Sequence, residues 1–94
     1  MSEDCLVLNI WSPKPKHQNT TQVLKPVMFW IHGGAFTIGS SFQPGYNGSA
    51  LATNDVVVVT INYRLGPLGF LYANDTSAPG NVAFYDQLLA LKWV

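Results

Sequence analysis

The sequence is poor in charged residues. Asp, Glu, Lys and Arg make up 11% of its 94 residues, whereas a typical globular domain has about 25%. Hydrophobic residues make up 48%. Since a small free-standing domain has much surface to cover with polar side chains, we expect this sequence to be the buried part of something larger. Its ends support that expectation, because Met1 leads straight into a strand-like run and Val94 stops inside a helix-like pattern.

The sequence also lacks an excess of either charge and a long apolar run. Its formal net charge is zero, and its five basic residues are scattered along the chain. Because nucleic-acid-binding proteins carry clustered basic residues, we expect no nucleic-acid partner. No apolar run approaches the roughly 18 residues of a membrane span, and the sequence leaves membrane attachment and oligomeric state undetermined. We assign no metal site and expect no cofactor.

Cys5 is the single cysteine, so no disulfide can form within these residues. Three Asn-x-Ser/Thr glycosylation sequons lie in predicted loops, which is more than we expect from chance in so short a sequence. They begin at Asn19, Asn47 and Asn74. Together they indicate the secretory pathway, and we predict a secreted or lumenal protein. In that setting Cys5 is expected to form half of a disulfide with a partner elsewhere. The alternative is a buried free thiol.

Three segments have the patterns of β-strands. Residues 5–11 alternate in side-chain type, with successive residues on opposite faces. Residues 22–31 form the second segment, in which the apolar run Val27–Ile31 predicts a buried strand. Residues 56–62 are β-branched almost throughout. That composition is typical of a strand that is buried on both faces of a sheet covered by helices.

The third segment is followed by an irregular connection and then by a helix. Residues 63–81 contain several glycines and prolines, which predicts a loop. Asn81 is a good N-cap residue, and the next apolar residues share one helical stripe. This stripe consists of Val82, Tyr85, Leu88 and Leu89. Asp86 is expected near the start of the helix, where it suits the helix dipole. The order of elements fits an α/β fold with antiparallel leading strands.

The long loop after the second strand begins with His32–Phe36, which we interpret as an oxyanion-binding loop. The strand stops at His32 and two glycines follow, so the backbone can turn sharply and present its N–H groups. In acyl transfer, such N–H groups stabilise the negative charge that develops on the substrate oxygen. We predict that Gly34 and Ala35 donate two of them and that Gly33 shapes the turn. The alternative is an ordinary glycine turn after a strand.

Several motifs, in order along the chain, resemble those of the type-B carboxylesterases, the family that includes the cholinesterases. Ser2–Ile10 resembles the family's EDCLYLN signature, with Val7 in place of the usual Tyr. His32–Phe36 resembles its HGGG-type loop, with Ala35 in place of a third glycine. The remaining matches are Asn62–Gly66 with Gly69–Leu71, and Pro79–Asn81 with Asp86–Gln87 and Ala90–Trp93. We therefore interpret residues 1–94 as part of a carboxylesterase type-B domain.

This resemblance implies an α/β-hydrolase fold, in which helices flank a mixed, mostly parallel central sheet and of which only an N-terminal part is present. It implies a serine ester hydrolase that acts on a small-molecule ester through an acyl-enzyme, with a Ser-Glu/Asp-His triad. The sequence has no Gly-x-Ser-x-Gly. In the family the triad residues lie further along the chain, so residues 1–94 alone are expected to be inactive. His32 is then a residue that orders the loop, and Cys5 pairs with a cysteine upstream of Met1.

The resemblance leaves the role of two aromatic residues and the function itself open. Phe36 and Phe42 either line the substrate gorge, with Phe36 in contact with the substrate, or pack in the core. The protein is either an esterase or a catalytically inactive, neuroligin-like adhesion protein of the same fold. Nothing in the loop spoils catalysis, which favours the esterase. Cholinesterases often have Tyr where His32 stands, which favours a general carboxylesterase, but the motifs do not identify the ester.

Overall fold

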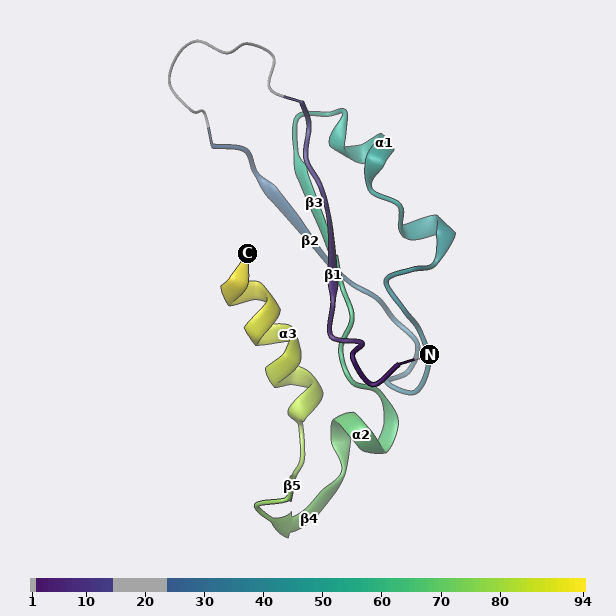
Figure 1. The fold of residues 1–94 in the computed structure, drawn as a ribbon, viewed down its shortest axis with the longest axis vertical. Helices are drawn as coiled ribbons and strands as arrows, with labels where there is room; N and C mark the ends of the chain where they lie inside the picture. The colour runs from purple at the N-terminus through teal and green to yellow at the C-terminus, as the bar shows by residue number, and fades with distance from the viewer. Residues whose placement is uncertain (1, 15–23) are drawn as a thin grey trace.

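A three-stranded sheet forms the centre of the protein. The computed structural model describes residues 2–14 and 24–94. The sheet consists of β1 (Leu8–Trp11), β2 (Val27–Ile31) and β3 (Val57–Ile61), in the order β1-β3-β2. β1 runs antiparallel to β3, and β2 runs parallel to it (Figure 1). The predicted α/β fold with a mixed sheet is therefore confirmed, with the last of the three strands at the centre.

The central strand is buried and the outer strand β2 is not. Val59 and Ile61 of β3 are at most 1% exposed, as the β-branched run predicted. The prediction of a buried strand at Val27–Ile31 was wrong. Trp30 is 47% exposed and Ile31 is 41% exposed, because β2 lies at the edge of the sheet and the described residues cover it only in part, through the contact of Tyr46 with Trp30.

β1 is shorter than the predicted strand over residues 5–11. The N–H of Cys5 donates to the carbonyl of Glu3, and the N–H of Val7 donates to the carbonyl of Cys5, each at 2.9 Å. These bonds to the second residue back curl the chain tightly, so the strand ladder begins only at Leu8. The predicted start of the second strand, residues 22–23, lies outside the described residues, and β2 begins at Val27.

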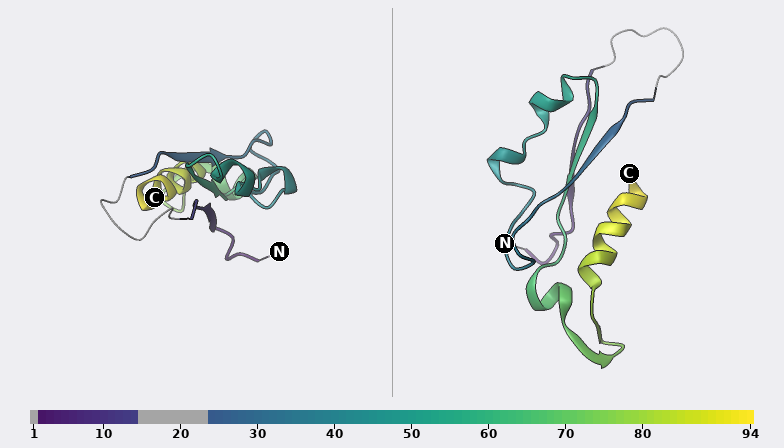
Figure 2. Two further views of the ribbon diagram at one scale, coloured as in Figure 1. Left: turned by 90° about the horizontal axis from the view of Figure 1, so that it is seen from above. Right: turned by 180° about the vertical axis from the view of Figure 1, so that it is seen from behind.

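Short helices lie on both sides of the sheet. η1 (Pro44–Tyr46) and α1 (Ser49–Ala52) connect β2 to β3. α1 lies on one side of the sheet and α3 (Val82–Trp93) on the other (Figures 1 and 2). The connection 63–81 was predicted to be irregular, which was wrong: it holds α2 (Gly66–Phe70) and a hairpin of β4 (Tyr72–Asp75) and β5 (Ala78–Pro79). Its Gly-Pro pair begins a helix, because proline fits the first turn of one.

α3 turns a different face toward the rest of the chain than the predicted stripe. Ala83 is fully buried and Asp86 is 9% exposed, whereas Tyr85, Leu88 and Leu89 of the stripe are exposed and Val82 is half-buried. A Cβ added to Gly69 of α2 would lie 2.9 Å from the Cβ of Ala83. Because the two helices meet this closely, only small side chains fit between them. Asn81 occupies the predicted N-cap position, but with a φ of 59° and no hydrogen bond from its side chain.

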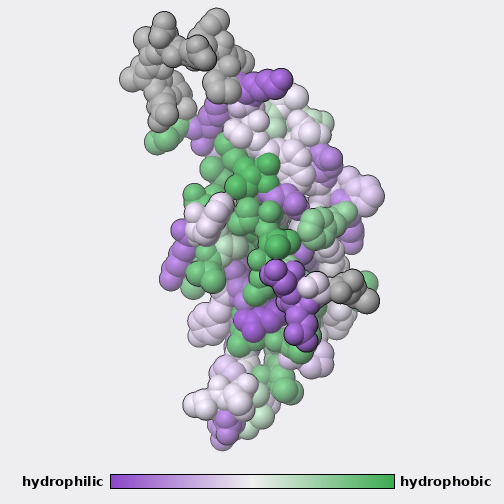
Figure 3. Space-filling view, viewed as in Figure 1, coloured by the Kyte–Doolittle hydropathy of each residue, from purple (hydrophilic) through white to green (hydrophobic). Residues whose placement is uncertain are grey.

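Apolar side chains remain on the surface of the described residues. Figure 3 shows them gathered along the middle of one face. They include Leu6, Val7 and Ile10 at the start of the chain and Leu89, Leu91 and Trp93 on α3. None of the helices in residues 2–14 and 24–94 has the length and apolar character needed to cross a membrane.

Candidate functional site: the loop after β2

The predicted oxyanion loop forms a tight left-handed turn directly after β2. The strand ends at Ile31, and the carbonyl of Gly34 accepts hydrogen bonds from the N–H groups of Thr37 at 3.0 Å and Ile38 at 3.1 Å. The two central residues of the turn have positive φ, 51° at Ala35 and 63° at Phe36. Two successive positive φ values are the mark of a type I′ turn. The chain therefore reverses within four residues of the glycine pair.

This turn stores backbone strain. Residues other than glycine lose roughly 1–2 kcal/mol in the left-handed region, because the Cβ approaches the backbone carbonyl, and Ala35 and Phe36 both lie there. Gly34 has a φ of 133°, and a Cβ added to it would lie 1.7 Å from the carbonyl oxygen of Ile38. A Cβ added to Gly33 would meet nothing within 4 Å. The residue that the turn requires to be glycine is thus Gly34 and not Gly33.

The strain predicts an unusual response to glycine at position 35. Ala35→Gly removes the Cβ from a left-handed residue, which outweighs the greater freedom of glycine in the unfolded chain. We expect the free energy of unfolding to rise by about 0.5 kcal/mol. The matched change Ala90→Gly, in the interior of α3, is expected to lower it by about 1 kcal/mol. Thermal melts of the two variants measure the difference, and a loss of stability in both would contradict the strained turn.

The backbone N–H groups at the turn are available to an external acceptor. Within residues 2–14 and 24–94, the N–H groups of Gly34 and Ala35 donate to no carbonyl or side chain. Gly34 is half-buried and Ala35 is exposed. Because a backbone N–H group is a strong hydrogen-bond donor, two adjacent unpaired donors at this turn are suited to bind an oxygen atom that arrives from outside. The positions of both donors are set by the turn and not by their side chains.

His32 is buried beneath this loop, with 2% of its surface exposed. Its Nδ1 lies 2.9 Å from the carbonyl oxygen of Gly33, so Nδ1 carries the proton and donates. The imidazole stacks on the ring of Tyr63, with 4.6 Å between the centroids and 21° between the planes. A Cβ added to Gly39 would lie 2.4 Å from His32 Nδ1. His32 therefore fills the space under the loop, bonded to Gly33 and packed against Gly39.

Phe36 packs against other aromatic rings and keeps one side open. Its ring lies edge-on to Phe70 at 5.1 Å and to Phe84 at 6.0 Å, and those two rings lie 5.3 Å apart. Edge-to-face pairs of this kind stabilise a fold by about 0.5–1.5 kcal/mol each beyond the area they bury. Phe36 is nevertheless 52% exposed, and Phe42 is 64% exposed with no ring partner among the described residues. The structure therefore supports the alternative that Phe36 packs against other side chains. Contact of Phe36 with the substrate remains a prediction.

An ion pair ties the segment after β3 to α3. Arg64 donates from Nε and Nη2 to the two carboxylate oxygens of Asp86, at 2.8 and 2.7 Å, and its backbone N–H donates to Oδ2 at 3.0 Å. Burial disfavours the charged carboxylate, but the hydrogen bonds and charge of Arg64 outweigh it and hold the pKa of Asp86 below its usual value. Asp86 lies outside the first turn of α3. The prediction that it interacts with the helix dipole was therefore wrong.

The predicted modification sites differ in what the structure says of them. Asn47 and Asn74 are exposed. Their side-chain oxygens accept hydrogen bonds, from the N–H of Ser49 and from the hydroxyl of Tyr72, each at 2.9 Å. Their side-chain nitrogens, to which a glycan would attach, donate to no group in residues 2–14 and 24–94. Asn19 lies outside the described residues. Cys5 is an exposed free thiol, so the alternative of a buried thiol was wrong, and its disulfide stays a prediction.

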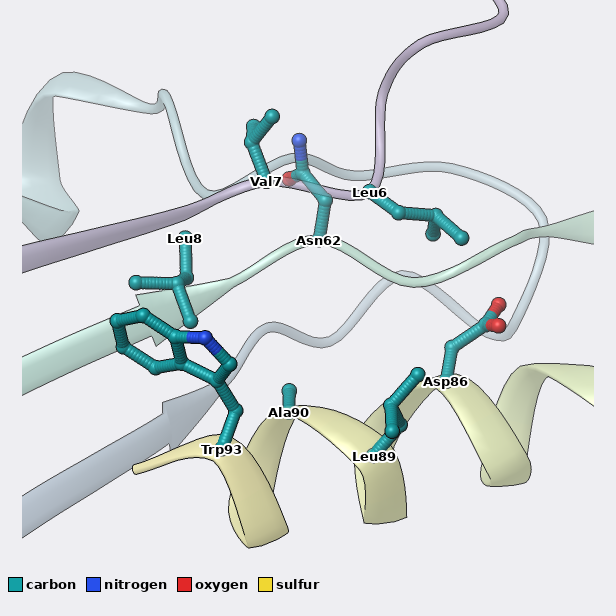
Figure 4. Close-up of a pocket in the computed structure, with 8 residues that line it drawn as sticks. All are labelled: Leu6, Val7, Leu8, Asn62, Asp86, Leu89, Ala90 and Trp93. Carbon is teal, nitrogen blue, oxygen red and sulfur yellow. The ribbon is translucent and has the colours of Figure 1, made fainter.

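An apolar groove of about 440 Å³ lies between the start of β1 and α3. Figure 4 shows Leu8 of β1 facing Trp93 of α3 across it, with Leu89 and Asp86 further along the same helix. None of the loop residues 33–36 lines this groove. Its two polar side chains, Asn62 and Asp86, are already hydrogen-bonded. We therefore assign no chemistry to it. The described residues also contain no group of acidic, histidine or cysteine side chains that could hold a metal ion.

Comparison of the sequence with models of known protein families identifies the family to which the chain belongs. The family model described as "Carboxylesterase family" matches residues 1–94. The chain belongs to this family. Among curated carboxylesterase relatives, it is 55% identical to acetylcholinesterase-1 of Trittame loki and 54% identical to carboxylesterase 3 of Pongo abelii, over 100% of the chain in both cases. It spans 17% and 16% of the lengths of these two proteins.

Solved carboxylesterase structures confirm the fold. The chain superposes on the structure named PNB esterase with a TM-score of 0.85 and 50% identity, over 99% of this chain and 20% of that one. The α/β-hydrolase fold expected from the motifs is therefore confirmed. The sequence predicts Asn62–Gly66 only as a family motif and indicates no role for its side chains. The run of polar residues directly after an apolar strand was the signal that these side chains have partners.

Proposed function

We propose that this chain supplies the oxyanion-binding loop of a serine carboxylic ester hydrolase. The observation that supports this proposal most directly is that the N–H groups of Gly34 and Ala35 both lack an acceptor and lie in a strained turn. Membership of the carboxylesterase family supports the reaction class. In the proposed reaction a serine outside these residues attacks the ester carbonyl. The carbonyl oxygen becomes negatively charged, and the two N–H groups stabilise it until the alcohol leaves and an acyl-enzyme remains.

The chemistry of the loop requires residues that this chain does not hold. The nucleophile, acid and histidine of the triad are proposed to lie further along the full-length protein, so residues 1–94 alone are expected to have no activity. Exposed sequons at Asn47 and Asn74 support a secreted or lumenal location. Cys5, exposed before β1, is proposed to form a disulfide with an upstream cysteine.

Labelling with a fluorophosphonate tests the esterase directly. We expect the full-length protein to hydrolyse a p-nitrophenyl ester and to lose that activity as one serine is modified, because only an activated serine reacts with the reagent. Peptide mapping locates the modified serine. If the full-length protein neither reacts with the fluorophosphonate nor hydrolyses the ester, the proposal is contradicted, and a binding or adhesion protein of the same fold is favoured. A protein denatured before labelling is the control for non-specific reaction.

A further inference from the structure

A short segment directly after β3, residues 62–66, forms hydrogen bonds to the oxyanion loop and to the chain that follows it. Tyr63 Oη donates to the carbonyl of His32 at 2.8 Å. The N–H of Gly66 donates to the carbonyl of Phe36 at 2.7 Å. The side chain of Asn62 accepts from the N–H of Ser41 at 2.9 Å.

The bond from Tyr63 fixes the direction in which the loop leaves β2. A peptide unit is planar, so holding the carbonyl of His32 also holds the N–H of Gly33 on the other side of the same plane. Tyr63 is 6% exposed, and burial raises the pKa of its phenol. The hydroxyl therefore remains protonated at neutral pH and continues to donate. The carbonyl of Phe36 is held in the same way by Gly66, so Gly34 and Ala35 lie between two fixed peptide planes.

Asn62 links the chain beyond the loop, at Ser41, to the segment before β1. Its side-chain oxygen holds Ser41, and its side-chain nitrogen donates to the carbonyl of Cys5 at 3.0 Å. The hydroxyl of Ser41 accepts from Asn9 of β1 at 3.3 Å, and the same Asn9 nitrogen lies 3.1 Å from the hydroxyl of Thr60. Ser41 is 3% exposed. Ser41 is therefore held in a part-buried network of side-chain hydrogen bonds.

We propose that Tyr63 is a positioning residue for ester hydrolysis, and that its hydroxyl sets the aim of the Gly34 and Ala35 N–H groups through the carbonyl of His32. This inference rests on the proposed function. Tyr63 touches neither substrate nor reacting atoms in this account. A donor helps catalysis only when it points at the oxygen that becomes charged in the transition state. Loss of the hydroxyl should therefore slow the chemical step and leave substrate binding nearly unchanged.

Tyr63→Phe in the full-length protein tests this role, because it removes the hydroxyl and keeps the ring that stacks on His32. Tyr72→Phe is the matched control: it also removes a hydroxyl with a 2.9 Å hydrogen bond, to Asn74 in the exposed hairpin. We expect Tyr63→Phe to lower kcat for a p-nitrophenyl ester about tenfold or more with KM within about twofold. Tyr72→Phe is expected to change neither constant by more than about twofold.

The outcomes separate the inference from the proposed function. If the wild-type protein hydrolyses the ester and Tyr63→Phe behaves like Tyr72→Phe, or raises KM alone, the positioning role is overturned while the esterase stands. If the wild-type protein neither hydrolyses esters nor reacts with a fluorophosphonate, both are overturned. Should Tyr63→Phe not fold, Asn62→Ala replaces it. Its control is Asn54→Ala, which loses a 3.2 Å bond to Leu51 on the surface, and the same split between kcat and KM decides.

Discussion

Under the proposed esterase function, Gly34→Ala is expected to lower kcat of the full-length protein by about 10²–10³, the loss typical of removing an oxyanion donor. The new Cβ would lie 1.7 Å from the carbonyl oxygen of Ile38, far inside contact distance, and the φ of 133° is one that alanine rarely adopts. The turn must therefore open, and the N–H groups of Gly34 and Ala35 must move with it. Steady-state kinetics with a p-nitrophenyl ester measure the loss.

The control for this change is Gly45→Ala in η1. A Cβ at Gly45 meets nothing within 4 Å, and Gly45 has no positive φ, so the substitution adds the same methyl group without a clash. We expect kcat of this variant to remain within about twofold of wild type. Equal losses in both variants, or a Gly34→Ala enzyme with full activity, would show that the turn does not supply the donors.

Asp86→Asn is expected to be the most destabilising change outside the loop. Breaking a buried ion pair costs about 3–5 kcal/mol, because one charge is left uncompensated. The side chain of Arg64 is 41% exposed while that of Asp86 is 7% exposed, so water relieves part of the penalty. We therefore expect the free energy of unfolding to fall by about 2 kcal/mol. The shift in the midpoint of urea unfolding between the wild-type and variant full-length proteins measures the loss.

The ion pair between Arg64 and Asp86 also predicts how the free energy of unfolding changes with pH. Because the folded pKa of Asp86 lies below its usual value, its contribution to stability is present above about pH 4, the usual carboxylate value. The contribution is lost as pH falls through the lowered folded pKa. The stability difference between wild type and Asp86→Asn should therefore shrink in acid. A difference that stays constant from neutral pH to pH 3 would contradict the charged pair.

The surface pair Lys25–Asp55 provides the control for Asp86→Asn. It is an ion pair whose side chains are 27% and 51% exposed. Exposed pairs contribute about 0–1 kcal/mol. Lys25→Gln should therefore change the unfolding midpoint much less than Asp86→Asn, and a comparable shift would mean that burial is not the source of the effect.

The features that sequence alone predicted are those that depend on local chemistry. The β-branched run at 56–62 predicted the buried central strand, since few other environments favour it. The break from an apolar strand into Gly33-Gly34 located the loop. Linked motifs in order predicted the family, because each fixes a different part of one fold. These signals lie within a few residues of the structure they specify.

The features that sequence could not predict depend on contacts between distant residues. The inward face of α3 is set by its close approach to Gly69, which the apolar stripe does not reveal. Burial of β2 depends on what lies beside it, and the described residues cover it only in part. The left-handed φ of Ala35 and Phe36 has no local signature, because both residue types disfavour it. The hydroxyl of Tyr63 reaches the carbonyl of His32 because β2 and β3 are paired, and that pairing joins residues distant in sequence.

The strand order has a consequence during synthesis on the ribosome. β1 and β2 do not pair with each other, since β3 lies between them and comes last. Roughly 25 residues separate the end of β2 from the start of β3, which takes about 1–5 seconds to translate at ~5–20 residues per second. For that interval the nascent chain carries two apolar strands without a partner. The speed of translation through residues 32–56 therefore sets how long these two strands remain unpaired.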